Sequence, residues 1–136
     1  MNTPEDIVDT LSFFDSWEDR YKYMIDLGKS LPAMDESLHT EDRLVPGCQS
    51  QVWIEPNFVD GHFEFQVDSD AHIVRGLLAI VMAAYNFKSP REILNFDISH
   101  YFNQLDLVKH LSPTRGNGLQ AMVEKIKQMA QAKVAA

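Results

Sequence analysis

The chain holds a single cysteine, Cys48, in a setting of turn-forming and polar residues. It lies within residues 45–53, which read VPGCQSQVW. A cysteine thiolate can attack sulfur or carbon electrophiles, and the neighbouring Gly47 has no side chain to obstruct a partner's backbone. A proline–glycine pair is typical of a turn. The pattern predicts a reactive thiol at the tip of a loop.

A second interpretation of Cys48 stays open at this stage. Free cysteines are most often small buried hydrophobic residues, and composition alone favours that role. No lysine or arginine lies between Leu44 and Arg75, so the local sequence offers no cation that would lower the pKa of the thiol. A cysteine hydrolase also needs a nearby base. The chain has five histidines, but their spacing does not indicate whether any of them reaches Cys48.

Other kinds of chemistry fit the sequence poorly. One cysteine cannot form an intrachain disulfide or a four-cysteine zinc site, and the histidines do not have metal-ligand spacing. Residues 115–118, RGNG, superficially resemble a phosphate-binding loop. They lack the Gly-Lys-Ser/Thr ending and a preceding apolar strand. We interpret them as the start of a helix that follows Ser112 and Pro113.

Length, charge and hydropathy place the chain in a broad class. Its 136 residues are enough for one domain, 1–136, with a core of its own. The net charge of −8 disfavours nucleic acid as a partner. It serves solubility or attracts a basic protein surface. We find neither a secretory signal nor an apolar run of roughly 18 residues. A soluble, cytoplasmic protein without a membrane partner is therefore expected.

Hydrophobic periodicity predicts an α+β fold, with a small antiparallel sheet and helices packed on one face. Phe63, Phe65 and Val67 alternate with polar residues, and Asp60-Gly61 is a hairpin turn signal. The apolar face of the hairpin needs helices to cover it. Residues 33–44 lack periodicity and are expected to form a surface loop. Strands are expected at 49–55 and 58–68, and helices at 3–15, 16–28, 70–85, 89–94, 100–105 and from 115 or 117 to 132. Residues 68–70 are expected to cap the helix at 70–85, whose apolar run predicts that it is the central helix.

Four segments together resemble one known family, the SufE proteins, in their order and spacing. They are 28–32 (GKSLP), 45–53 (VPGCQSQVW), 68–77 (DSDAHIVRGL) and 111–119 (LSPTRGNGL). The resemblance extends from about residue 7 to residue 127, and the segment around the cysteine is specific to the family. It implies a fold similar to that of the IscU scaffold.

The resemblance also implies a function. SufE proteins accept persulfide sulfur from a pyridoxal-phosphate-dependent cysteine desulfurase of the SufS or CsdA kind. They stimulate that enzyme and pass sulfur to an iron–sulfur scaffold or another acceptor. The acceptor cysteine of the family falls on Cys48. Asp70 and Arg115 are implied to lie near the cysteine loop as supporting residues. Their alternative roles are capping of a helix by Asp70 and the start of the C-terminal helix at Arg115.

Two other functions are weighed against the sulfur carrier. A cluster-assembling scaffold of the related fold uses three cysteines, and this chain has one. A regulatory module would activate an enzyme without any chemistry at Cys48. The carrier itself needs no metal or other cofactor. The sequence leaves open whether the chain belongs to the SufE or the CsdE branch, and whether it is a monomer or a homodimer. We also expect Leu44, Val45 and Trp53 to shelter Cys48 in the free protein.

Overall fold

A β-hairpin forms where aromatic and β-branched residues alternate with polar ones. In the computed structural model, which describes residues 2–135, β1 spans Val52–Val59 and β2 spans His62–Ser69. The strands are antiparallel, and Val59 pairs with His62 next to the turn. Asp60 and Gly61 both have positive φ, 51° and 84°, as a tight two-residue hairpin turn requires. The expected turn is confirmed, but residues 58 and 59 end the first strand and do not begin the second.

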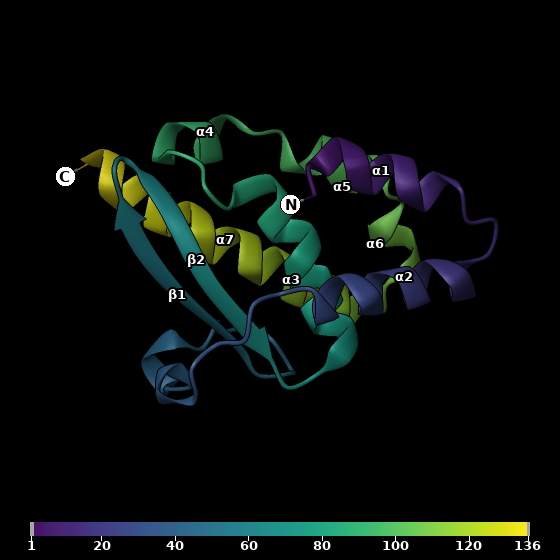
Figure 1. The fold of residues 1–136 in the computed structure, drawn as a ribbon, viewed down its shortest axis with the longest axis horizontal. Helices are drawn as coiled ribbons and strands as arrows, with labels where there is room; N and C mark the ends of the chain where they lie inside the picture. Colours follow the sequence, from purple (N-terminus) through teal and green to yellow (C-terminus); the bar gives the residue numbers. More distant parts are fainter. Residues whose placement is uncertain (1, 136) are drawn as a thin grey trace.

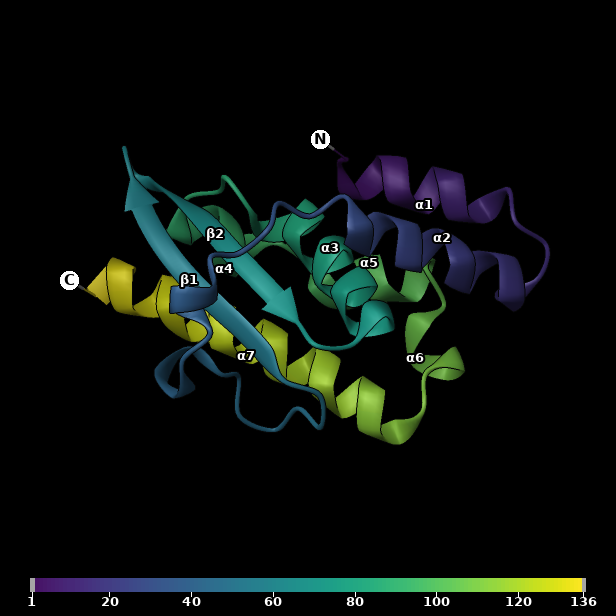
Figure 2. The same cartoon turned by 60° about the horizontal axis from the view of Figure 1, so that its bottom comes forward.

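Helices cover one face of this hairpin. Phe63, Phe65 and Val67 of β2 are buried and belong to the same core as α3 (His72–Tyr85) and α7 (Pro113–Ala135). Figures 1 and 2 show α7 running along one side of the sheet, with α3 between the sheet and the other helices. The predicted α+β fold is confirmed. The apolar run predicted to form a central helix is α3, which is buried along most of its length.

Short helices complete the layer around α3. A capping box between Thr3 and Asp6 starts α1. Packing of α2 against α3 is so close that a Cβ on Gly76 would lie 2.3 Å from the Met24 carbonyl oxygen, so glycine is required there. The helices around α3 and α7 are α1 (Pro4–Ser12), α2 (Trp17–Lys29), α4 (Pro90–Asn95), α5 (Ile98–Gln104) and α6 (Leu107–His110). The predicted surface loop contains two 3₁₀ turns, η1 (Glu36–Leu38) and η2 (Glu41–Arg43).

Two helix starts near Cys48 differ from the prediction, the first in the residue that caps it and the second by two residues. The sequence predicts that residues 68–70 cap α3, but its N-cap is Ala71, with no side-chain cap hydrogen bond. The carboxylates of Asp68 and Asp70 bind other segments instead. The last helix begins at Pro113, before the expected Arg115, because the Ser112 hydroxyl accepts a hydrogen bond from the Arg115 N–H at 3.3 Å.

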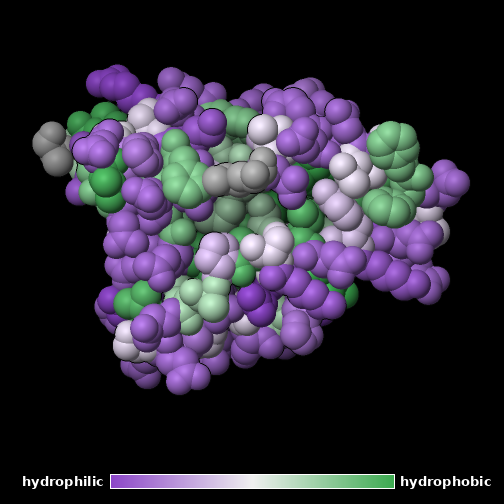
Figure 3. Space-filling model, in the orientation of Figure 1, coloured by the Kyte–Doolittle hydropathy of each residue, from purple (hydrophilic) through white to green (hydrophobic). Residues whose placement is uncertain are grey.

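Most of the surface seen in Figure 3 is hydrophilic, in keeping with the acidic composition. Apolar residues show as separate patches among the polar ones, several of them near the middle of that view. A groove of about 440 Å³ lies between α2 and α3, and Leu27, Leu31 and Met82 are among the residues that line it.

Within residues 2–135, no helix combines the length and the apolar character needed to cross a membrane.

Candidate functional site

Cys48 sits in a short loop whose two ends are held together. The Val45 N–H donates a hydrogen bond to the Val52 carbonyl at 2.8 Å, and Leu44 forms a bridge with Trp53. Residues 46–51 are therefore tied at their base, where the chain enters β1. Gly47 has a φ of +90°, a conformation that glycine adopts at little cost. The turn inferred from proline and glycine beside the cysteine is present.

The loop folds back onto α7, so that the thiol is half-buried. The Cys48 Sγ donates a hydrogen bond to the Gly118 carbonyl oxygen at 3.5 Å. A Cβ on Gly118 would lie 3.6 Å from the sulfur, and one on Gly47 would lie 3.5 Å from the Ala121 Cβ. Both distances are ordinary van der Waals contacts, so the loop and the helix lie against each other without the tight approach that only glycine permits. Cys48 is neither a fully exposed loop thiol nor a core residue.

This position keeps the sulfur protonated. Burial raises the pKa of the Cys48 thiol because a thiolate would lose solvation there. The hydrogen bond to the Gly118 carbonyl acts in the same direction, since only the S–H form can donate it. The closed loop therefore holds Cys48 in its less nucleophilic form.

A pocket of about 270 Å³ lies beside the sulfur. One part of its wall is apolar and comes from Val74, Leu77 and Met122 of α3 and α7. The rest is polar, and the Ser112–Arg115 turn contributes to it. The residues lining the pocket are Cys48, Gln49, Ser50, Val74, Leu77, Ser112, Thr114, Arg115, Gly118 and Met122. None of these residues is a histidine.

The residues predicted to shelter Cys48, which are Leu44, Val45 and Trp53, do not line the pocket beside the sulfur. The apolar wall beside the sulfur comes from α3 and α7, not from the residues that flank the loop in sequence. Val45 is buried in the core, and Trp53 stacks on the His39 ring with centroids 4.3 Å apart. No sequence signal points directly to the Gly118 carbonyl or to Met122, because their proximity to Cys48 depends on how α7 packs.

Asp70 holds the C-terminal side of the cysteine loop. Its Oδ1 accepts a hydrogen bond from the Gln51 N–H at 3.1 Å, and its own N–H donates to the Gln51 carbonyl at 3.3 Å. The alternative role in capping α3 is wrong, because Ala71 is the N-cap and the helix start has no side-chain cap hydrogen bond. The structure therefore brings Asp70 next to the loop.

Arg115 combines the two roles considered for it. It lies in the first turn of α7, and it also lines the pocket together with Cys48. It is the one charged residue among those that line this pocket. A cation that lines the pocket favours negative charge on a sulfur that occupies it. Across residues 2–135, no three histidine, cysteine or acidic side chains gather closely enough to hold a metal ion.

The fold is shared with a solved structure of very different sequence. A solution structure of a hypothetical protein from Thermus thermophilus matches with a TM-score of 0.78 at 14% identity. The match covers 98% of this chain and 96% of the other. At this level of identity the likeness concerns the fold alone.

Sequence comparisons identify the family. The chain is 43% identical over 140 residues to an uncharacterized SufE-like protein of Rhizobium meliloti, and the match covers 100% of both chains. It is 45% identical over 141 residues to an uncharacterized SufE-like protein of Rhizobium etli, covering 100% of this chain and 95% of the other. The family model of SufE, described as the Fe-S metabolism associated domain, matches residues 5–130. The chain therefore belongs to the SufE family.

Proposed function

We propose that this protein is a sulfur carrier that takes persulfide sulfur onto Cys48 from a pyridoxal-phosphate-dependent cysteine desulfurase in the cytoplasm. It stimulates that enzyme and passes the sulfur on for iron–sulfur cluster assembly. One observation supports this most: the chain's single cysteine lies in a tied loop beside a pocket, with its thiol turned onto α7. Family membership adds the association with iron–sulfur metabolism.

The chemical step is a sulfur exchange that needs no other oxidant. The Cys48 thiolate attacks the outer sulfur of the persulfide on the desulfurase cysteine, forming a new S–S bond. The original S–S bond breaks, and the desulfurase cysteine leaves as a thiolate. The proton lost by Cys48 is balanced by the proton that the leaving thiolate takes up. The chain has no second cysteine that would attack the new persulfide and release its sulfur.

Loading and storage of the sulfur on Cys48 place different demands on the position of the loop. In the closed loop, the sulfur is half-buried, and burial raises the pKa of the thiol, so less of it is thiolate. We infer that the loop 46–51 moves away from α7 toward the enzyme during loading. After loading, the outer sulfur needs space when the loop closes again. The pocket of about 270 Å³ provides it, since a water molecule occupies only about 30 Å³ in the liquid and a sulfur atom is of comparable size.

Intact-mass spectrometry tests the proposal. The chain is incubated with a cysteine desulfurase of the SufS or CsdA kind and L-cysteine, and then analysed before and after treatment with a reductant. We expect a gain of one sulfur atom that the reductant reverses and that Cys48→Ala lacks. If the mass does not increase, the chain is not a sulfur carrier.

The same variant separates the carrier from a regulatory module. Cys48→Ala leaves the fold intact, because alanine fits wherever cysteine does, but it cannot accept sulfur. A carrier loses its stimulation of the desulfurase with this change. A regulatory module that acts through binding alone keeps it. The pocket beside the sulfur favours the carrier, since binding alone requires no space next to the thiol.

A further inference from the structure

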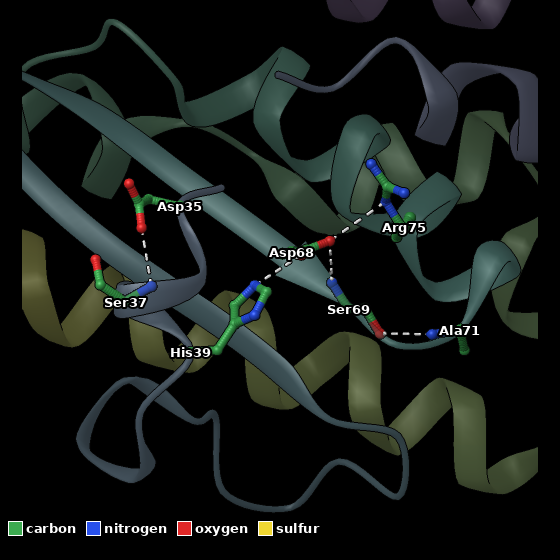
Figure 4. Close-up of polar contacts among 7 residues, drawn as sticks. All are labelled: Asp35, Ser37, His39, Asp68, Ser69, Ala71 and Arg75. Atoms are coloured by element: carbon green, nitrogen blue, oxygen red, sulfur yellow. Dashed lines mark hydrogen bonds and ion pairs between the residues drawn. The ribbon is translucent and has the colours of Figure 1, made fainter. Parts of the chain in front are cut away.

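The Asp68 carboxylate joins segments from three parts of the fold (Figure 4). Its Oδ2 lies 2.8 Å from the His39 Nε2, and its Oδ1 accepts a hydrogen bond from the Ser69 N–H at 2.8 Å. The Arg75 Nε lies 3.4 Å from the same Oδ1, within ion-pair distance. Only 19% of the Asp68 side chain is exposed, so these interactions are weakly screened by water.

Each partner of Asp68 belongs to an element that also contacts or leads to the cysteine loop. His39 lies in the segment that runs into the loop, and its ring stacks on Trp53 just beyond it. Arg75 is on α3, the helix that contributes Val74 to the pocket wall. Asp68 therefore connects the segment that leads into the cysteine loop with the helix that forms part of the pocket wall.

Asp68 also orders the turn that carries Asp70. The hydrogen bond to the Ser69 N–H fixes the start of that turn, and the Ser69 Oγ in turn accepts from the Ala71 N–H at 3.3 Å. Both residues that flank Asp70 are thereby held. The Asp70 carboxylate is then directed at the Gln51 N–H, at 3.1 Å. Ser69 is buried, among the residues that the structure describes. Its polar groups therefore rely on hydrogen bonds within the protein, and these bonds set the geometry of the turn.

We propose that Asp68 is a positioning residue, held by His39 and Arg75, which keeps the Asp70 turn in place and so keeps the Cys48 loop closed. The proposal deepens the proposed function and rests on it, because loop closure matters only if Cys48 reacts. Asp68 does not touch the sulfur and acts through Asp70 and Gln51. Losing its carboxylate removes the hydrogen bond to the Ser69 N–H and the contacts to His39 and Arg75, while the bond between the Ser69 Oγ and the Ala71 N–H remains.

The rate at which iodoacetamide alkylates Cys48 in the free, full-length protein tests the proposal, because it measures loop opening without a desulfurase. Asp68→Ala is expected to raise this rate about tenfold, the effect of losing one hydrogen bond to a charged group. Glu55→Ala is the matched control. The Glu55 side chain is 22% exposed on the same hairpin and pairs with Arg43 of the same surface loop. The control should change the rate by less than about twofold.

Two substitutions of His39 provide a second test, which holds even if Asp68→Ala does not fold. His39→Ala removes the contact to Asp68 and should accelerate alkylation. His39→Gln keeps a nitrogen donor of similar reach and should restore the wild-type rate, which a merely packing role of the ring would not do. Melting temperatures establish that each variant is folded.

Equal acceleration by Glu55→Ala and Asp68→Ala would overturn the proposal, since it would reflect general loosening of the loop. So would an unchanged rate in both Asp68→Ala and His39→Ala. These outcomes are independent of the proposed function, which depends on sulfur transfer seen by mass spectrometry. A protein that accepts sulfur with no change in alkylation rates refutes the positioning role alone. A protein that shows the expected rates but never gains sulfur refutes the carrier alone.

Discussion

Asp70 and Gln51 exchange two hydrogen bonds across the end of the cysteine loop. The Gln51 N–H donates to the Asp70 Oδ1 at 3.1 Å, and the Asp70 N–H donates to the Gln51 carbonyl at 3.3 Å. Substitution can remove only the first of these, because the second joins backbone groups. The side chain of Asp70 is thus an adjustable clasp on a loop whose base is already closed by Val45 and Val52.

Removing the clasp should open the loop more often. Asp70→Ala deletes the acceptor for the Gln51 N–H, and we expect Cys48 to be alkylated about three- to tenfold faster than in the wild type. Asp70→Asn keeps a side-chain oxygen and should have a smaller effect. Mass spectrometry over an iodoacetamide time course measures both rates. If Asp70→Ala reacts no faster than the wild type, the clasp does not limit opening.

The raised pKa of Cys48 has a consequence for stability at alkaline pH. Because the pKa of this thiol is higher in the folded state, its contribution is fully present below the unfolded pKa. As pH rises from there toward the folded pKa, the unfolded state loses its proton first and the contribution is lost. The free energy of unfolding should therefore fall more between about pH 7 and 9.5 in the wild type than in Cys48→Ala. Urea denaturation at both pH values measures this. Parallel curves for the two proteins would contradict it.

The sequence predicts features that depend on local chemistry. Alternating residues locate the hairpin, and the proline–glycine pair locates the cysteine loop, because turn geometry and strand pleating are properties of adjacent residues. The prediction that residues 68–70 cap α3 is wrong. An aspartate before a helix is a typical cap, yet here the side chains of Asp68 and Asp70 reach His39 and Gln51, which are distant in sequence.

The residues around the sulfur also could not be predicted from the sequence, because they are distant from Cys48 along the chain. Apolar neighbours in sequence suggest that Trp53 covers Cys48, whereas the pocket wall comes from α3 and α7. Which helix face meets a loop depends on packing across the whole core. The acceptor of the thiol hydrogen bond is a backbone carbonyl, that of Gly118, and every residue has one. No residue type identifies such a partner in advance.

A methyl group at position 118 should separate folding from sulfur storage. Gly118→Ala places a Cβ 3.6 Å from the Cys48 sulfur, which is ordinary contact for the thiol but narrows the space beside it. Replacing a helical glycine should stabilise the fold by roughly 0.5–1 kcal/mol. We expect the persulfide on Cys48 to be reduced several-fold faster by dithiothreitol, because it fits the pocket less well. Gly116→Ala is the control, since its Cβ would meet no atom within 4 Å. Equal persulfide lifetimes in the two variants would argue against storage in this pocket.

The charge of Arg115 should matter for loading more than for folding. Arg115→Gln keeps the backbone N–H that bonds Ser112 but removes the cation that lines the pocket. We expect sulfur acceptance to slow by about three- to tenfold, because the pocket loses the cation that favours negative charge on the sulfur it receives. Arg91→Gln, at an exposed position of α4, serves as the control. Rapid-quench mass spectrometry measures loading. Equal rates in the two variants would mean that the charge of Arg115 does not affect loading and that the residue serves only as part of the first turn of α7.

A double-mutant cycle decides whether Asp68 and Asp70 act on the loop in sequence or separately. If Asp68 works by holding the Asp70 turn, nothing remains for it to position once the Asp70 carboxylate is gone. Asp68→Ala combined with Asp70→Ala should then alkylate at about the rate of the faster single variant, and the coupling energy should be as large as the smaller single effect. Independent action would make the two accelerations multiply. Glu55→Ala combined with Asp70→Ala provides the reference for independent sites, because Glu55 pairs with Arg43 and has no bond to the Asp70 turn among the described contacts. Multiplicative behaviour of Asp68 and Asp70, like that of the reference pair, would place Asp68 outside the path that closes the cysteine loop.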